Sequence, residues 1–226
     1  MTVVRAPRVE RLHLPGPAGP LEALIETPVS DEGEAASAPP AFGVVCHPHP
    51  LYGGTLDNKV VHTLARAFNQ LGAPTIRFNF RGVGASAGAY DEGRGETEDA
   101  LAVVDFGRRR WPDTPLWLGG FSFGGAVAVR AAGSAQPGRL VLVAPAIGRI
   151  GVDGAAAPAC PWLVVQGDAD DVVPPAEVLE WAGSLTPAPE VAVVREAGHF
   201  FHGRINELRD AVLAFMARAA QASRAA

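Results

Sequence analysis

The sequence has few cysteines, no excess of positive charge and no long apolar run. Its two cysteines, Cys46 and Cys160, cannot supply a framework of several disulfides. The net charge of −5 comes without a basic cluster, which argues against nucleic acid or an acidic membrane surface as a partner. No stretch approaches the roughly 18 apolar residues of a membrane span, and residues 1–9 lack the apolar core of a secretion signal. We therefore expect a soluble, cytoplasmic protein that does not bind membranes.

The residues that are present have the composition of a globular protein, with 48% hydrophobic and 19% charged side chains. A chain of 226 residues can bury a sizeable core. No internal repeat or linker divides it, so we expect a single domain over residues 1–226. Residues 28–40 are rich in alanine, glutamate, serine and proline, which predicts a flexible surface loop.

Short apolar runs alternate with helix-like segments along most of the chain. Two β-like segments come first, and a turn rich in proline and glycine separates them. Strands are expected at residues 9–14, 21–26, 42–46, 75–78, 116–118, 140–143, 162–165 and 191–194. Helices are expected at residues 61–71, 96–107, 126–132, 178–185 and 205–219. Repeated βα units predict a mostly parallel, eight-stranded α/β sheet with helices on both faces.

One stretch, Gly120–Gly124, reads Gly-Phe-Ser-Phe-Gly between an expected strand and an expected helix. Strand, sharp turn and helix is the setting in which G-x-S-x-G presents a serine as a nucleophile. The turn would hold Ser122 in strained backbone angles, and the glycines would let neighbouring elements approach. The backbone N–H of Phe123 and the helix N-terminus would then face a developing negative charge. A chance glycine-serine turn would lack catalytic partners elsewhere in the chain.

Such partners follow two later strands. The loop after Gln166 reads Gly-Asp-Ala-Asp-Asp-Val-Val-Pro, and the loop after Arg195 reads Glu-Ala-Gly-His-Phe-Phe-His. In open α/β sheets, the catalytic and ligand-binding residues lie in loops at the carboxyl ends of the strands. Together with Ser122, these loops give the chain order serine, aspartate, histidine.

Within these loops, Asp170 fits the spacing G-x-x-D-x-x-V-P and is the predicted acid. Asp168 and Asp171 are better explained as turn or capping groups. His199 is the predicted base, which would take the Ser122 proton on one ring nitrogen while Asp170 holds the other. His202 is the competing histidine, and a place on the surface or at a helix start suits it better.

With these motifs placed, the chain from about Phe42 onward resembles the α/β-hydrolase superfamily, and within it the compact serine hydrolases that lack a cap domain. The resemblance rests on Gly120–Gly125, the aspartate and histidine loops, and the segments His47–Gly54 and Arg77–Ser86. It implies an α/β-hydrolase fold without a cap and a Ser122-His199-Asp170 triad. We interpret Arg81 and Asn79 as a pair that shapes a loop beneath the active site, with a substrate contact as the less favoured role. Cys46 is expected to be a buried residue at a strand end.

The segment that begins at His47 departs from the commoner His-Gly pattern, because His47-Pro48 stands there. In this family the residue just beyond the pair supplies the second oxyanion-hole N–H. Prolines carry no N–H, which leaves His49 as the first choice and Leu51 as the second, beside Phe123. Leu51, Tyr52 and Phe123 are expected to line the substrate site. His47 and His49 lack an accompanying acidic or cysteine cluster, so we expect no metal.

The resulting hypothesis is a serine hydrolase that cleaves small carboxylic esters through an acyl-enzyme and needs no cofactor. An acyl thioesterase with the same triad is the alternative, and a non-catalytic binding protein with this fold is the less favoured one. The expected partner is a small ester or thioester. The sequence leaves open the leaving group and whether the chain forms a homodimer.

Overall fold

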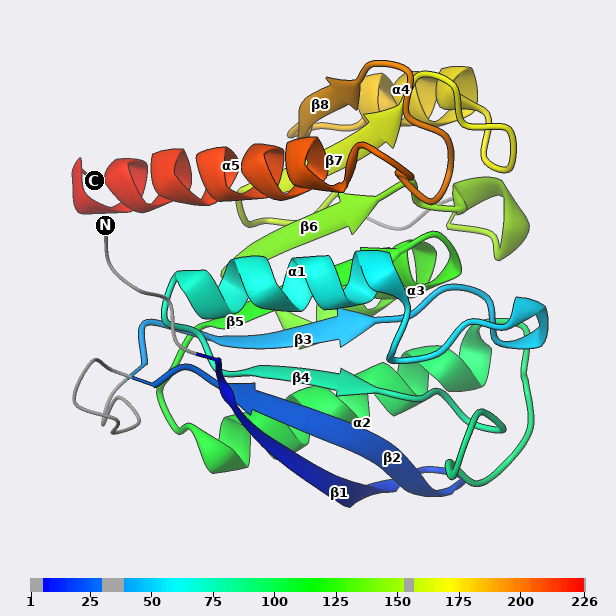
Figure 1. Cartoon of the computed structure of the whole chain (residues 1–226), viewed down its shortest axis with the longest axis vertical. Coiled ribbons are helices and arrows are strands. Elements are labelled where there is room, and N and C mark those ends of the chain that lie inside the picture. The colour runs from blue at the N-terminus through cyan, green and yellow to red at the C-terminus, as the bar shows by residue number, and fades with distance from the viewer. Residues whose placement is uncertain (1–5, 30–38, 153–156, 226) are drawn as a thin grey trace.

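An eight-stranded sheet with helices on both faces organises the chain (Figure 1). The structure is a computed structural model that describes residues 6–29, 39–152 and 157–225. The strands are β1 (Arg8–Gly16), β2 (Gly19–Thr27), β3 (Phe42–Cys46), β4 (Thr75–Phe78), β5 (Leu116–Phe121), β6 (Arg139–Val143), β7 (Trp162–Gly167) and β8 (Glu190–Val194). The helices are α1 (Lys59–Gln70), α2 (Arg94–Arg110), α3 (Phe123–Ala135), α4 (Pro175–Ser184) and α5 (Ile205–Ala225), with short 3₁₀ turns η1 (Pro50–Tyr52) and η2 (Ile147–Arg149).

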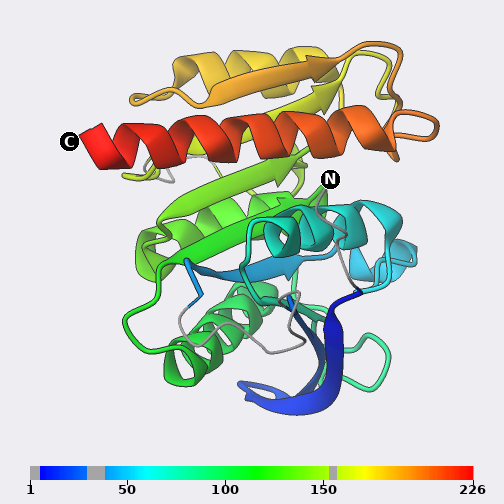
Figure 2. The same cartoon turned by 60° about the vertical axis from the view of Figure 1, so that its left-hand side comes forward.

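The strand order is β1-β2-β4-β3-β5-β6-β7-β8. Strand β2 runs antiparallel to both of its neighbours, and the pairs from β4 to β8 are parallel. The β1–β2 hairpin bends strongly at one edge of the twisted sheet (Figure 2). The prediction of a mostly parallel, eight-stranded sheet with helices on both faces is therefore confirmed. The predicted surface loop over residues 28–40 lies mostly outside the described residues.

Strand β5 is three residues longer than its apolar run predicts. It continues through Gly119 and Gly120 to Phe121, and Gly119 pairs with Val45 of β3 on one side and Val141 of β6 on the other. Glycines carry no side chain that could add to a hydrophobic pattern, which is why the run appears to end at Leu118. The extension brings the strand directly up to Ser122.

Two apolar cores lie on opposite faces of the sheet. Helices α1 and α5 cover one face, and α2, α3 and α4 cover the other (Figures 1 and 2). Along β3, Val44 belongs to the core beneath α2 and α3, whereas Val45 belongs to the core beneath α1 and α5. Strands buried on both faces read as continuous apolar runs, as these do.

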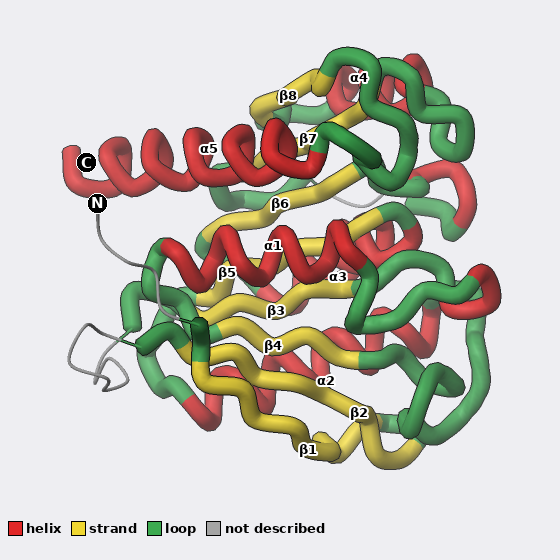
Figure 3. Tube along the Cα trace, in the orientation of Figure 1, coloured by secondary structure: helices red, strands yellow, loops and turns green. Residues whose placement is uncertain are grey.

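The arrows of the parallel strands all point to one edge of the sheet (Figure 1), where loops connect the strands to the following elements (Figure 3). Behind this edge, a buried ion pair joins the loop after β4 to helix α2. The Arg81 guanidinium donates to both carboxylate oxygens of Asp99, over 3.0 and 2.9 Å, and the Arg81 backbone N–H donates over 2.9 Å. A Cβ at Gly95 would lie 1.9 Å from the guanidinium, so a larger residue there would displace Arg81 from its place beside Asp99. Arg81 thus shapes its loop as expected.

We expect Asp99→Ala to lower the free energy of unfolding by about 3–5 kcal/mol, because Arg81 would lose its buried partner and keep only the exposed Glu98 carboxylate, 3.3 Å away. Asp105→Ala on the same helix is the matched control, since that carboxylate is 61% exposed and lies 3.7 Å from Arg108. Its loss should stay below about 1 kcal/mol. Urea unfolding measures both variants, and equal losses would contradict a structural role for the buried pair.

Candidate active site

Ser122 lies at the sharp turn between β5 and α3, with φ 55° and ψ −118°. This positive φ is strained for a residue with a side chain. Two glycines permit the turn, because a Cβ at Gly120 would lie 2.2 Å from the Gly124 carbonyl oxygen. A Cβ at Gly124 would lie 2.4 Å from the carbonyl oxygens of both Cys46 and His47. The turn is therefore pressed against the end of β3.

The serine, histidine and aspartate that the sequence singles out form one hydrogen-bonded chain. His199 Nε2 lies 3.0 Å from Ser122 Oγ, and His199 Nδ1 lies 2.8 Å from Asp170 Oδ2. All three residues are buried, with exposed fractions of 4 to 7%. This geometry fits a Ser-His-Asp triad, in which the imidazole can accept the serine proton and the carboxylate orients the ring.

Asp170 is held by a full set of donors. Its Oδ1 accepts the backbone N–H groups of Val172 and Val173 over 2.9 and 2.8 Å, and its Oδ2 accepts Gln166 Nε2 over 3.1 Å. Burial raises the pKa of this carboxyl, but the bonds from His199, Val173 and Val172 outweigh it and hold the pKa below its usual value. The carboxylate therefore stays ionised beside the imidazole.

The competing candidates do not join this chain. Asp168 Oδ1 accepts the Glu196 backbone N–H, as expected of a turn group, and Asp171 is exposed. His202 is exposed, and its ring contacts Phe200.

The loop after β3 carries His49, the first candidate for the second oxyanion-hole donor. His49 and Ser122 line the same cavity, and the His49 N–H makes no hydrogen bond within the described part of the chain. Phe123 is the first residue of α3, so its N–H has no acceptor within the helix. The Leu51 N–H instead donates to the His49 Nδ1 over 3.2 Å. The N–H of Leu51 is therefore occupied within its own loop, and His49 as the second donor stays a prediction.

His47 holds this loop, a role that the motif alone did not reveal. Its Nδ1–H donates to the Pro48 carbonyl over 2.6 Å, and its Nε2 accepts the Phe80 N–H over 3.0 Å. Burial lowers the pKa of His47 to about 4, so the ring is neutral and can donate at one nitrogen while accepting at the other. The Pro48 carbonyl and the His49 N–H belong to one trans peptide and point in opposite directions. Fixing the carbonyl therefore aims the N–H.

The cavity over Ser122 has a volume of about 460 Å³, and its lining includes His49, Tyr52, Arg149, His199 and Phe200. Of the residues expected to contact substrate, Tyr52 lines this cavity. Leu51 does not, because η1 leaves its side chain 67% exposed and outside the lining. The Phe123 side chain is buried against the rings of His49, Tyr90 and Phe80 and does not line the cavity either.

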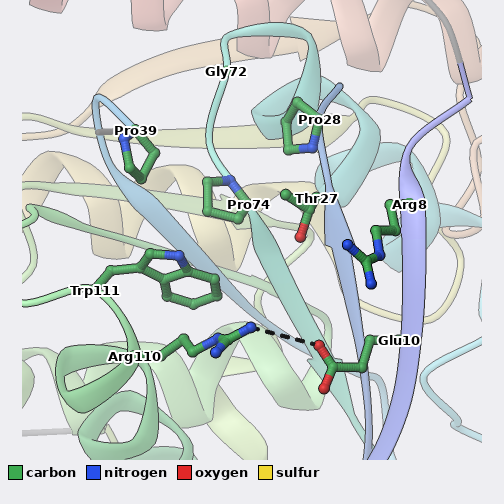
Figure 4. A pocket seen from close by; sticks show the side chains of 9 residues that line it. All are labelled: Arg8, Glu10, Thr27, Pro28, Pro39, Gly72, Pro74, Arg110 and Trp111. Carbon is green, nitrogen blue, oxygen red and sulfur yellow. Dashed lines mark ion pairs between the residues drawn. The ribbon is translucent and has the colours of Figure 1, made fainter. Parts of the chain in front are cut away.

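A second cavity, of about 210 Å³, lies at the opposite edge of the sheet, where the parallel strands begin (Figure 4). Its lining includes Arg8, Trp111 and an ion pair between Arg110 and Glu10 at 3.8 Å. Its described lining offers the Thr27 hydroxyl and the Glu10 carboxylate but no histidine to act as a base, so the chemistry of the chain points to the cavity over Ser122.

Within the described ranges, no group of three or more histidine, cysteine, aspartate or glutamate side chains could hold a metal ion. Cys46 is buried at the end of β3 as expected, and burial raises the pKa of its thiol. None of the helices in the described part of the chain is long and apolar enough to cross a membrane.

Comparison with known proteins finds relatives that are similar to this chain over most of its length. The family model for serine aminopeptidases, S33, matches residues 53–159, a range that contains Ser122 but ends before Asp170. An α/β serine hydrolase without lid from Xanthomonas campestris is 40% identical, with a TM-score of 0.87 over 96% of this chain and 97% of that one. An α/β serine hydrolase homologue from Coxiella burnetii is 43% identical, with a TM-score of 0.84 over 90% and 95%. An uncharacterized protein from Rickettsia prowazekii is 29% identical over 89% of this chain and 86% of its own length.

Two substitutions of His47 can distinguish the role of its Nδ1 from the role of its Nε2. In His47→Asn, the side-chain amide can still donate to the Pro48 carbonyl, and ester turnover should largely persist. In His47→Gln, the longer amide can accept the Phe80 N–H but no longer fixes Pro48, and kcat should fall about 100-fold with little change in KM.

Steady-state kinetics on a p-nitrophenyl ester measures both constants, and thermal unfolding checks that both variants fold. If the two substitutions lowered kcat equally, or raised only KM, the aiming role of His47 would be excluded.

Proposed function

The chain belongs to the α/β serine hydrolases, and we propose that within this family it hydrolyses small carboxylic esters through an acyl-enzyme on Ser122. The observation that carries the proposal is the hydrogen-bonded chain from Ser122 Oγ through His199 to Asp170. In a non-catalytic protein with this fold, nothing would keep three buried polar residues from three loops in one catalytic geometry.

In the proposed mechanism, Ser122 Oγ attacks the ester carbonyl carbon while His199 Nε2 takes the hydroxyl proton. The resulting imidazolium donates that proton to the leaving alcohol, and the acyl group stays on the serine. A water molecule then attacks the acyl-enzyme, with His199 again as base, and releases the carboxylic acid. Asp170 keeps the ring in the tautomer and orientation that both steps need.

The oxygen of each tetrahedral intermediate carries a negative charge, which the N–H groups of Phe123 and His49 would stabilise. Both lie on backbone that is fixed before substrate binds, one at the helix start and one in the loop that His47 holds. Each preorganised donor of this kind lowers the activation free energy by roughly 2.7–4 kcal/mol.

The substrate site is open. Tyr52, Val172 and Phe200 line the cavity and are 80%, 41% and 44% exposed, so an acyl group resting on them stays partly in water. Each buried methylene contributes only about 0.8 kcal/mol. Short acyl groups therefore fit this site best.

We expect Ser122→Ala to fold normally and lose ester hydrolysis by several orders of magnitude. Asp170→Asn should lower kcat by about 10⁴-fold, because the amide favours the wrong histidine tautomer. Asp168→Asn is the matched control, since an asparagine oxygen can still accept the Glu196 N–H. Hydrolysis of p-nitrophenyl acetate measures all three variants.

Full activity in Ser122→Ala would refute the mechanism, and a steep loss in Asp168→Asn would show that the wrong carboxylate was assigned. Acyl-CoA substrates in the same assay test the thioesterase alternative. Amino-acid p-nitroanilides test the peptidase activity that the name of the matched family implies.

Catalytic efficiency should peak at acetate to butyrate esters and decline toward decanoate, because a longer chain finds no enclosed apolar surface. The rate should not rise as a substrate passes its solubility limit and forms micelles. A series of p-nitrophenyl esters of graded length measures kcat/KM, and a steady rise up to decanoate would contradict the open site.

A further inference from the structure

Arg149 is a cation that the fold holds at the mouth of the cavity over Ser122. The Ala146 N–H donates to the Ser122 carbonyl over 3.0 Å, and the Arg149 N–H donates to the Ala146 carbonyl over 3.1 Å. Between them, Ile147 is only 8% exposed and anchors η2 in the core. Two backbone hydrogen bonds thus connect the position of Arg149 to the strained turn that carries the nucleophile.

Among the residues that the structure describes, the guanidinium of Arg149 makes no ion pair and no hydrogen bond. Two other surface arginines, Arg94 and Arg204, each pair with two carboxylates. Its charge nevertheless reaches across the cavity. The pKa of His49 is lowered by burial and, in addition, by the positive charge of Arg149.

The rest of the described lining supplies hydrogen-bond donors and no negatively charged group. The described residues of the cavity lining include no aspartate or glutamate, and Asp170 lies behind His199 with its oxygens already occupied. Asn58 also lines the cavity; its Oδ1 accepts the Val60 N–H, and its amide N–H₂ makes no bond within the described part of the chain. In a chain with a net charge of −5, the described lining of this cavity therefore carries the positive charge of Arg149 and no carboxylate.

We propose that the preferred substrates are esters that carry a carboxylate or a similar anionic group, and that Arg149 binds this group. The inference rests on the proposed esterase function and narrows its substrate class. A planar guanidinium binds a carboxylate through two parallel hydrogen bonds, which a lysine cannot reproduce. The partly enclosed cavity screens this interaction less than open water would.

The test uses two pairs of esters that differ in one charge. In the first pair the acyl group differs, with p-nitrophenyl hydrogen glutarate against p-nitrophenyl hexanoate. In the second pair the leaving group differs, with p-acetoxybenzoate against p-acetoxybenzamide. The ratio of kcat/KM for the charged and the neutral ester is measured in the unchanged protein and in Arg149→Gln, Arg149→Lys and Arg109→Gln. Arg109 is an exposed arginine in the last turn of α2 and controls for the loss of one positive charge.

In at least one pair, Arg149→Gln should lower this ratio about tenfold, equivalent to about 1.4 kcal/mol. Arg149→Lys should lower it less, Arg109→Gln should leave it unchanged, and high salt should reduce the preference of the unchanged protein. A ratio that Arg149→Gln leaves unchanged in both pairs would overturn the inference while leaving the esterase function intact. Failure of the unchanged protein to hydrolyse any of the four esters would overturn the esterase function together with the inference.

Discussion

The site depends on one close approach of backbone to backbone, where the turn at Ser122 meets the end of β3. Gly124 lets the start of α3 approach the carbonyl groups of Cys46 and His47 so closely that no room is left for a Cβ. The same contact brings the N–H of Phe123 close to the loop that carries the N–H of His49. A larger residue at Gly124 would therefore separate the two N–H groups that we propose stabilise one oxyanion.

Hydrogen bonds from buried polar side chains hold the loops around this contact in place. His47 connects the loop after β3 to Phe80, and Asp170 connects the loop after β7 to His199. Asp99 of α2 accepts the N–H of Arg81 in the loop after β4. Hydrogen bonds to buried groups are directional and costly to break, so they position loops that apolar packing alone would leave free to shift. The machinery is thus arranged before any substrate arrives.

Sequence patterns predicted most of this architecture, because apolar runs and glycine turns report directly on buried strands and sharp bends. The three residues that form the hydrogen-bonded chain were also predictable, since each follows a strand in a recognisable motif. Side-chain direction was not predictable from such patterns, as the exposed Leu51 and the buried Phe123 show. The contacts of His47 and the place of Arg149 depend on elements distant in sequence, and no local pattern encodes them.

Direct detection of an acyl-enzyme tests the central claim, which is covalent catalysis by Ser122. The protein would be mixed with p-nitrophenyl acetate, quenched with acid within the first turnovers and digested for mass spectrometry. The account predicts a single acetyl group on the peptide that contains Ser122, formed at the rate of the nitrophenol burst. Turnover of the ester with an acetyl group on another residue, or with no covalent intermediate when deacylation is the slow step, would contradict it.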